Sequence, residues 1–195
     1  MVVSVNPVIL LAQAAPVREV KKAPEKVTTY VTDDVNVKIK EKGDLVTIEG
    51  TAWGSNVKIS IDPKKNEASV EVKGGKLFWR LMFRISAIAM GKWGEDDDNV
   101  KIDERFYDLD IIDTGDRLKI SGRNGGENIV AEVNLQTKEV SIKATAKGEY
   151  SEEYMEIRYL ATDIIKEIAF DPKYENDGSI TQVWDKVGIK AKYPK

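Results

Sequence analysis

A stretch of thirty residues in this chain is repeated 72 positions further along the sequence. The segment GDLVTIEGTAWGSNVKISIDPKKNEASVEV begins at Gly43, and GDRLKISGRNGGENIVAEVNLQTKEVSIKA begins at Gly115. The two segments align without a gap and share the pairs Gly43/Gly115, Asp44/Asp116, Ile48/Ile120, Gly50/Gly122, Gly54/Gly126, Asn56/Asn128, Glu67/Glu139 and Ser69/Ser141. A match of this length indicates an internal duplication, so the fold has to accommodate the same unit twice.

Each unit is predicted to be a β-meander. Apolar and polar residues alternate in most of its segments, and this period of two is typical of antiparallel strands with one buried and one solvent-exposed face. The inward-facing sets are Val35, Val37 and Ile39; Val57, Ile59 and Ile61; Ala68, Val70 and Val72; Tyr107, Leu109 and Ile111; Ile129, Ala131 and Val133; and Val140 and Ile142. Turn-forming residues separate them at 42–44, 63–66, 114–116 and 124–126.

The segment KLFWRLMFRISAIAM at 76–90 fits two interpretations. As a helix it places Leu77, Leu81, Ile85 and Ile88 on one side. As a strand it points Leu77, Trp79, Leu81, Phe83 and Ile85 inward, and Phe78, Arg80, Met82 and Arg84 outward. Its aromatic content and the preceding Gly-Gly pair favour a strand at the start, with a helical or turn-like end.

The segment at 151–170 is predicted to be a helix. Ser151 is placed to cap it, Glu152 and Glu153 lie in its first turn, where they favour the helix dipole, and Pro172 follows it. Its apolar face is formed by Tyr154, Ile157, Leu160, Ile164, Ile165 and Ile168. The tail from 178 to 193 is expected to add one or two strands, VWDKV and GIKAKY.

These elements predict an α+β fold that is mostly antiparallel β. The duplicated β-meander would form a twisted sheet or a barrel packed on one or two helices. We expect an N-terminal arm at 1–26, a first repeat at 27–104, a second repeat with its helix at 105–171 and a C-terminal tail at 172–195. The two repeats are expected to form one compact domain.

The N-terminal arm has an apolar run that is too short to span a bilayer, and no transmembrane segment is predicted. Pro7, Pro16 and Pro24 interrupt the arm, and AQAA within it is weakly similar to a signal-cleavage site. It is either a flexible leader, a processed segment or an ordered arm. In the ordered form Val8, Ile9, Leu10 and Leu11 would dock on a neighbouring molecule, allowing self-association.

Composition argues against most catalytic chemistry. The chain has no Cys and no His, which excludes disulfides, Cys/His zinc sites, thiol nucleophiles and imidazole bases. It contains no phosphate-binding loop, dinucleotide-binding motif or nucleophile elbow. We therefore expect no enzyme activity, no metal site and no cofactor. A glycosidase that needs only two carboxylates is compatible with the composition, but no aromatic cluster marks a cleft.

The charges also bear on location and ligands. There are 33 acidic and 30 basic residues, a net charge of −3 that is unlike the basic balance of duplex-DNA binders. The acidic run GEDDDN at 94–99 lacks the spacing of a calcium loop and is interpreted as a solvated hairpin tip. Abundant Lys and Glu without Cys is typical of proteins from hyperthermophiles. A cytoplasmic location is favoured.

The chain resembles the bacterial LURP-one-related proteins of the tubby-like superfamily over residues 35–171. The resemblance rests on a strand ending in IEG, Trp53 three residues later, a VKISI strand, a basic-glycine corner and an alternating aromatic segment. The ending YMEIRYLATDIIKEIAFD resembles that family's final strand and core helix. The resemblance implies a barrel around a central helix and binding of phospholipid or another apolar ligand. Unlike the family, both units here resemble the same half of the pattern.

Two other functions stay open. A duplicated module of four strands and a helix, of the Pur or Whirly type, would bind single-stranded nucleic acid through aromatic and basic side chains on the exposed sheet face. The candidate ligand or nucleic-acid surface is Lys38, Lys40, Lys58, Lys73, Phe78, Arg80 and Arg84. Alternatively, the chain is a self-assembling subunit of a filament or capsid that uses its N-terminal arm.

Overall fold

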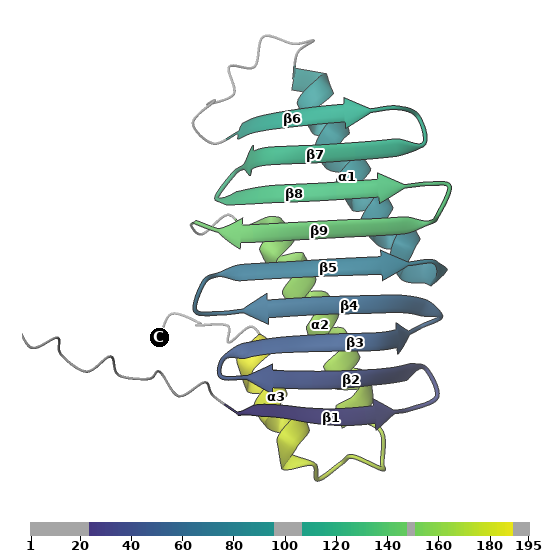
Figure 1. The fold of residues 1–195 in the computed structure, drawn as a ribbon, viewed down its shortest axis with the longest axis vertical. Helices are drawn as coiled ribbons and strands as arrows, with labels where there is room; N and C mark the ends of the chain where they lie inside the picture. Colours follow the sequence, from purple (N-terminus) through teal and green to yellow (C-terminus); the bar gives the residue numbers. More distant parts are fainter. Residues whose placement is uncertain (1–23, 96–106, 148–150, 189–195) are drawn as a thin grey trace, which may run out of the picture.

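The described residues of the chain fold into one antiparallel sheet of nine strands with three helices (Figure 1). A computed structural model describes residues 24–95, 107–147 and 151–188. The strands are β1 (Glu25–Val31), β2 (Val35–Lys42), β3 (Leu45–Ala52), β4 (Ser55–Asp62), β5 (Glu67–Lys73), β6 (Tyr107–Asp113), β7 (Arg117–Asn124), β8 (Glu127–Asn134) and β9 (Glu139–Ala146). Their order in the sheet is β1-β2-β3-β4-β5-β9-β8-β7-β6, so the two predicted meanders lie side by side.

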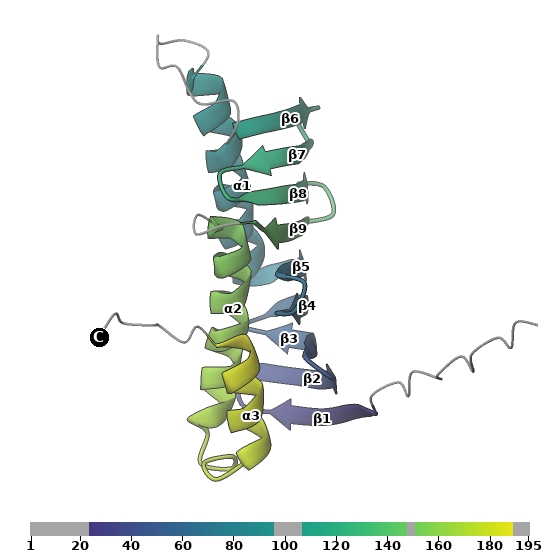
Figure 2. The same ribbon diagram turned by 90° about the vertical axis from the view of Figure 1, so that its left-hand side faces the viewer.

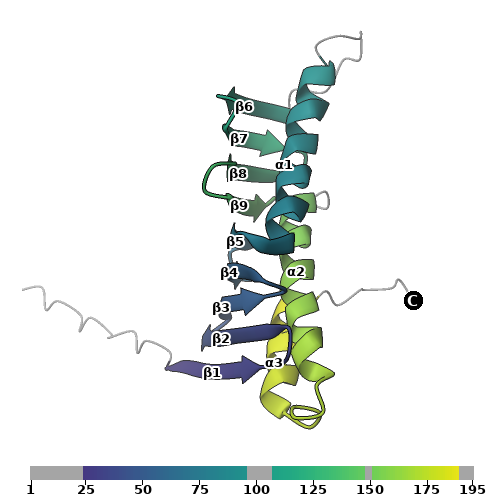
Figure 3. The same cartoon turned by 90° about the vertical axis from the view of Figure 1, so that its right-hand side faces the viewer.

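The helices α1 (Gly75–Glu95), α2 (Glu152–Ala169) and α3 (Gly178–Val187) all pack on one face of the sheet, as Figures 2 and 3 show. We call this the helix face and the opposite side the open face. The sheet does not close into a barrel, because β1 and β6 stand at its two ends. The prediction of a sheet with helices is therefore confirmed, whereas the alternative of a barrel around a central helix is wrong. Helices laid along one face bury the apolar side of the strands without closure.

The two meanders are related by a local two-fold axis between β5 and β9. The pairing of these strands places Val70 opposite Ile142, its counterpart in the repeat. The hydrogen bonds at the two ends of this pairing are also reciprocal. The Gly74 N–H donates to the Lys138 carbonyl at 2.9 Å, and the Ala146 N–H donates to the Asn66 carbonyl at 2.8 Å. The chain therefore pairs two copies of one unit as a symmetric dimer would.

Two identities in the repeat follow from a close approach of neighbouring strands. Gly50 and Gly122 have φ angles of 148° and 132°, a region that side chains disfavour. A Cβ atom on Gly50 would collide with the backbone carbonyl of Asn36, and one on Gly122 would collide with that of Asp108. Asn36 and Asp108 are themselves counterparts, so the same local geometry requires glycine in both units.

Residues 76–90 are helical throughout, so the prediction of a strand at the start of this segment is wrong. The buried residues recur with helical spacing and are Leu77, Phe78, Leu81, Ile85 and Ala89. The strand interpretation was misled by alternating bulky residues, which a helix distributes around its axis. Trp79 and Phe83, which that interpretation pointed inward, are exposed, and Phe78, which it pointed outward, is fully buried.

Both long helices cross the junction between the two meanders. Helix α1 packs on β4 and β5 of the first meander and extends over β9, β8 and β7, while α2 packs on β8 and β9 of the second meander and extends over β5, β4 and β2 (Figure 1). The helix predicted at 151–170 is confirmed as α2, and its predicted apolar face is buried. We call strands β1–β5 the first half of the sheet and β6–β9 the second half.

The strand VWDKV predicted in the tail is wrong, because these residues belong to α3. The Asp177 side chain caps this helix by accepting a hydrogen bond from the Ser179 N–H at 2.7 Å. Ile180, Val183 and Val187 follow at helical spacing and are buried against α2 and the first half. The second predicted strand, GIKAKY, lies almost entirely outside the described residues.

Candidate interaction surface

The predicted ligand surface is divided between the two faces of the molecule. Lys38, Lys40, Lys58 and Lys73 lie on strands β2, β4 and β5, at positions that alternate with the buried residues and so face the open side. Phe78, Arg80 and Arg84 lie on α1, on the helix face. The structure therefore brings the lysines together but separates them from the two arginines, and the predicted stacking platform Phe78 is 0% exposed.

Three of the four predicted lysines on the open face are paired with carboxylates. Lys40 pairs with Glu49 at 2.6 Å, Lys58 with Glu71 at 3.8 Å and Lys73 with Glu139 at 2.8 Å. One cross-strand row over β2–β5 alternates in charge and consists of Lys38, Glu49, Lys58 and Glu71. Opposite charges on neighbouring strands stabilise the pairing of the strands and leave little net potential for attracting a polyanion.

A groove of about 550 Å³ crosses the middle of the open face over β4, β5, β9 and β8. Its lining is Asn56, Val57, Lys58, Glu71, Val72, Lys73, Glu132, Asn134, Glu139, Val140 and Ser141. This lining mixes both charges with amides and contains no aromatic side chain. It therefore lacks the flat ring surfaces on which single-stranded bases stack.

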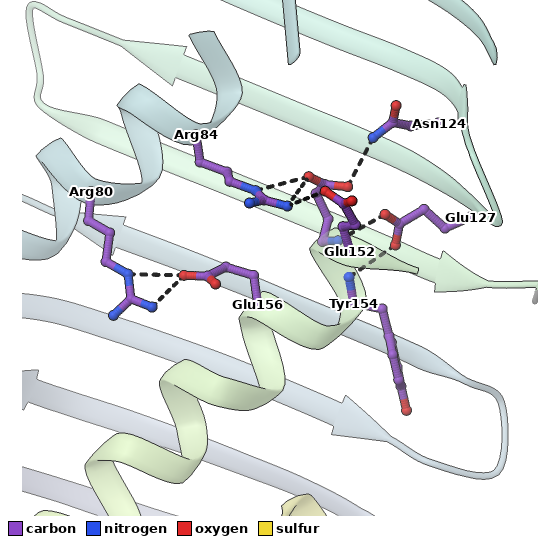
Figure 4. A network of polar contacts seen from close by, with 8 residues as sticks. Arg80, Arg84, Asn124, Glu127, Glu152, Tyr154 and Glu156 are labelled. Carbon is purple, nitrogen blue, oxygen red and sulfur yellow. Dashed lines mark hydrogen bonds and ion pairs between the residues drawn. The ribbon is translucent and has the colours of Figure 1, made fainter. Parts of the chain in front are cut away.

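Arg80 and Arg84 join the two long helices (Figure 4). The Nε atom of Arg80 donates to Glu156 at 3.0 Å, and that of Arg84 donates to Glu153 at 3.1 Å, with both carboxylates on α2. The Nη2 atom of Arg84 also donates to Glu152 at 2.9 Å. Because both guanidinium groups are held in this way, they contribute little to an exposed basic surface.

The first turn of α2 is capped by Glu127, which lies on β8. Its two carboxylate oxygens accept hydrogen bonds from the Glu153 and Tyr154 N–H groups at 2.9 and 3.0 Å. The predicted cap, Ser151, makes no capping hydrogen bond, so that prediction is wrong. Its hydroxyl donates instead to the Gly126 carbonyl at 3.2 Å.

Glu127 and Glu153 form a buried acidic pair, each only 1% exposed. Burial, as the largest cause, and a hydrogen bond to Glu153 together raise the pKa of Glu127 to about 8, against the opposing effect of the two N–H groups. Burial also disfavours ionisation of Glu153, but hydrogen bonds from Glu127 and Asn124 and the charge of Arg84 lower its pKa. At neutral pH, Glu127 therefore holds the proton and Glu153 carries the charge that pairs with Arg84.

The start of α1 is capped from the counterpart position in the first unit. Ser55, 72 residues before Glu127, is fully buried, and its hydroxyl oxygen accepts a hydrogen bond from the Leu77 N–H at 3.1 Å. The sequence analysis missed both caps. The available signal was that Ser55 and Glu127 are polar residues at aligned, inward-facing positions of strands whose other inward-facing residues are apolar. The symmetry of the two caps indicates that Glu127 and Glu153 serve to anchor α2, and neither residue lines the groove on the open face.

The side of α1 that points away from the sheet carries three large apolar residues together with the exposed Lys76 and Arg80. Trp79, Phe83 and Met90 lie on it and are 47%, 65% and 67% exposed. We call these three residues the outer stripe of α1. The rings of Trp79 and Phe83 are 6.4 Å apart between centroids. The matching side of α2 is more polar, with Asp163 and Lys166 among its residues.

The two halves of the sheet are covered unequally on the helix face. In the first half, under α2 and α3, Val37, Ile39 and Val46 are at most 2% exposed. Their counterparts in the second half, Leu109, Ile111 and Leu118, are only partly buried. Among residues 24–95, 107–147 and 151–188, no helix beside α1 plays the part that α3 plays beside α2 (Figure 1).

The β1 edge of the sheet is held by contacts with α3 and with the loop before it. The hydroxyl group of Tyr174, which lies in the loop before α3, bonds to both the N–H and the carbonyl of Val31 on β1. Its ring packs edge-on against Tyr30 at 5.2 Å. Lys186 of α3 forms an ion pair with the buried Glu41 of β2. These contacts fasten α3 and its loop to the first half.

Comparison with known proteins gives no further guide to function. No family model matches the chain, and no curated protein or solved structure is significantly similar to it. The resemblance to LURP-one-related proteins therefore stays a prediction. The docking residues predicted in the arm, Val8 to Leu11, and most of the acidic run at 94–99 lie outside the described residues.

The described part of the chain has neither a metal-binding cluster nor a membrane-spanning helix. It contains no group of three or more His, Cys, Asp or Glu residues arranged to hold a metal ion. None of its helices is both long enough and apolar enough to cross a membrane.

Proposed function

We propose that this chain is a non-catalytic structural subunit that associates with copies of itself through the helix face of its second half. The unequal cover of counterpart residues carries this proposal. Ile39 is buried, whereas its counterpart Ile111 is left partly exposed beside a helix whose outer stripe is aromatic. Contiguous apolar surface on a folded chain normally marks a contact with a partner.

The two sheet edges favour association through the helix face rather than through pairing of edge strands from different copies. On β1, the Tyr174 hydroxyl already occupies the backbone groups of Val31. On β6, the aspartates Asp108 and Asp110 are exposed on the open face. Charged side chains and occupied backbone groups are the usual means by which edge strands avoid joining other sheets.

Binding of single-stranded nucleic acid has less support. Such proteins need rings for stacking and cations for phosphates on one surface. Here Lys40, Lys58 and Lys73 are paired with glutamates, and the groove on their face has no aromatic lining. The aromatic residues Trp79 and Phe83 lie on the other side of the sheet.

Binding to a lipid surface also has less support. The outer stripe of α1 is apolar, but the cations Arg80 and Arg84 beside it are held by carboxylates of α2. Glu152, whose side chain is 75% exposed, lies close to Arg84 and would oppose approach to an anionic bilayer. A lipid surface is therefore treated as an alternative outcome of the experiment.

Sedimentation velocity of the full chain from about 1 to about 200 µM tests the proposal, because weak subunit contacts dissociate in this range. We expect a rise in mass with concentration that Ile111→Ser weakens. Val130→Ser is the matched control, since Val130 is an exposed valine on the open face of the same half. Thermal unfolding of both variants confirms that they fold.

A chain that stays monomeric throughout this range contradicts the proposal. A second comparison uses a chain that begins at Glu25 and lacks the N-terminal arm. If only the full chain associates, the arm makes the contact and the second half does not. Binding of the monomer to vesicles containing phosphatidylserine, lost in Ile111→Ser, would favour the lipid surface.

A further inference from the structure

We propose that the buried acidic pair of Glu127 and Glu153 is a proton-dependent switch. While the two side chains share one proton, they hold the start of α2 against α1 and the sheet, and loss of the proton releases it. This inference does not depend on the proposed self-association, because it concerns a contact within one chain.

Three other elements meet the first turn of α2 at this pair (Figure 4). Glu127, on β8, accepts hydrogen bonds from two backbone N–H groups of α2 at 2.9 and 3.0 Å. Glu153, on α2, accepts one hydrogen bond from Arg84 of α1 at 3.1 Å and another from the Asn124 side chain of β7 at 3.0 Å. The pair therefore joins α2 to one helix and two strands at a single point.

Capping by itself does not require an acid at this place in the fold. At the counterpart position in the first unit, the hydroxyl group of Ser55 accepts a hydrogen bond from the start of α1. A serine hydroxyl does not titrate near neutral pH, so this anchor keeps one charge state. The second unit has a carboxylate there with a second carboxylate against it, each 1% exposed. The ability to change charge is therefore what distinguishes the two anchors.

The positive charge bonded to the pair suffices for one carboxylate but not for two. Arg84 bonds to Glu153 and also to the exposed Glu152, at 2.9 Å. The next arginine of α1, Arg80, is held by Glu156. Further along α2, Arg158 donates to backbone carbonyl groups at the end of α3 and lies over the Tyr154 ring.

The strands packed against the pair do not supply a second cation. In the described residues of β7, β8 and β9, charged side chains other than Glu127 alternate to the open face. Arg123 of β7 is one of these and lies 3.9 Å from Asp108. Lys147, which follows β9, is exposed. A second negative charge within the pair would therefore have no buried partner.

Two ionised carboxylates in one buried place repel each other, so the closed pair retains a proton. Burial and the contact with Glu153 raise the pKa of Glu127 to about 8. When the start of α2 separates from the sheet, water reaches Glu127 and its pKa returns towards the ordinary value of 4.5. Opening therefore releases a proton, and its equilibrium constant rises about tenfold for each pH unit below the higher pKa.

Hydrogen exchange of the full chain, followed by mass spectrometry, measures this opening in peptides that contain Glu153 and Tyr154. Protection is expressed relative to the intrinsic exchange rate at each pH. We expect it to fall by a factor of about 10 or more between pH 6 and pH 8. Dilute urea should leave it unchanged, because a local opening exposes little surface.

Two results of this measurement would overturn the proposal. Constant protection across the pH range would show that the pair does not control the start of α2. Exchange as sensitive to urea as that of β4 would show that the start of α2 opens only when the whole chain unfolds.

Three variants assign the effect to the pair. Glu127→Gln and Glu153→Gln each leave one carboxylate facing an amide that donates a hydrogen bond at every pH, and each should reduce the pH effect to less than about twofold. Glu152→Gln is the matched control, because Glu152 bonds to the same arginine but its side chain is 75% exposed. It should keep the wild-type dependence.

Thermal unfolding identifies which of the three variants fold. Retention of the pH effect in either folded variant of the pair would overturn the proposal by assigning the proton to another group. Loss of the effect in Glu152→Gln would also overturn it, since the exposed charge around Arg84 would then control the opening.

Discussion

The first and second halves of the sheet share one sequence pattern, but only the first is closed. Val37, Ile39 and Val46 lie beneath α2 and α3, while Leu109, Ile111 and Leu118 occupy the same positions in β6 and β7 and are partly exposed. The strands are equivalent, and the difference comes from what covers them. A duplicated unit can therefore keep one strand pattern while its two copies bury that pattern to different extents.

The largest expected effects come from Gly50 and Gly122, and they test whether the strands of the two halves are equivalent. Gly50→Ala should lower the free energy of unfolding by about 4 kcal/mol, because the new Cβ meets backbone and φ is unfavourable. Gly122→Ala should cost about half as much, about 2 kcal/mol, because the strand it meets, β6, is at the end of the sheet and can move aside. Urea denaturation measures both. Equal losses would show that the end strand is as rigid as the inner one.

The unequal cover predicts a second difference in stability. Ile39→Ala should cost about 3 kcal/mol, because it leaves a cavity in a fully buried site. Ile111→Ala should cost about 1 kcal/mol, because this side chain is only partly removed from water. Both values come from denaturation at low concentration, where subunits are separate. A similar cost at both sites would mean that the second half is as well covered as the first.

The two helix caps should differ in their response to pH. The pKa of Glu127 is about 8 in the folded chain and 4.5 as its ordinary value. Between these values the folded chain holds a proton that the unfolded chain has released, so stability falls as pH rises. From pH 5.5 to 7.5 we expect a loss of about 2.5 kcal/mol, because each pH unit in this range corresponds to about 1.4 kcal/mol.

Two variants isolate this effect. Glu127→Gln keeps one acceptor for α2 and should remove the pH dependence in this range, measured by denaturation at several pH values. Ser55→Ala removes the counterpart cap of α1 and should cost about 1 kcal/mol at every pH. The opposing contribution of Glu153, whose pKa is lowered, falls below this range. An unchanged slope in Glu127→Gln would assign the dependence to another group.

The smallest expected effect concerns the open face. Lys73→Ala removes an exposed pair with Glu139, and exposed ion pairs contribute little to stability. Its unfolding curve should overlay that of the wild type, and self-association should not change. A marked loss of association would show that the contact surface is on the open face and not on the helix face.

The repeat and the strands could be predicted from the sequence, because alternation and turn residues are local signals. Residues 76–90 could not, because bulky apolar residues at nearly every position satisfy both periods. The positions of Phe78 and Trp79 were interchanged as a result, and the outer stripe was not recognised.

The caps and the two-fold axis depend on contacts between distant residues. The hydrogen bond from Leu77 to Ser55 and those from α2 to Glu127 cross more than twenty positions of sequence. Aligned counterparts such as Val70 and Ile142 could have suggested the axis, but only the register of β5 and β9 establishes it. Local propensity contains no information on either feature.

The position of α2 across the junction has a consequence for the order of events during synthesis. The first meander is complete once residue 73 has been made, and α1 follows over β4 and β5, but α2, which packs on β2, β4 and β5, ends at residue 169. Part of the apolar side of the first meander therefore stays uncovered until nearly the whole chain has been synthesised. Folding must be concerted across both units, and a nascent chain arrested before α2 should be a substrate for chaperones.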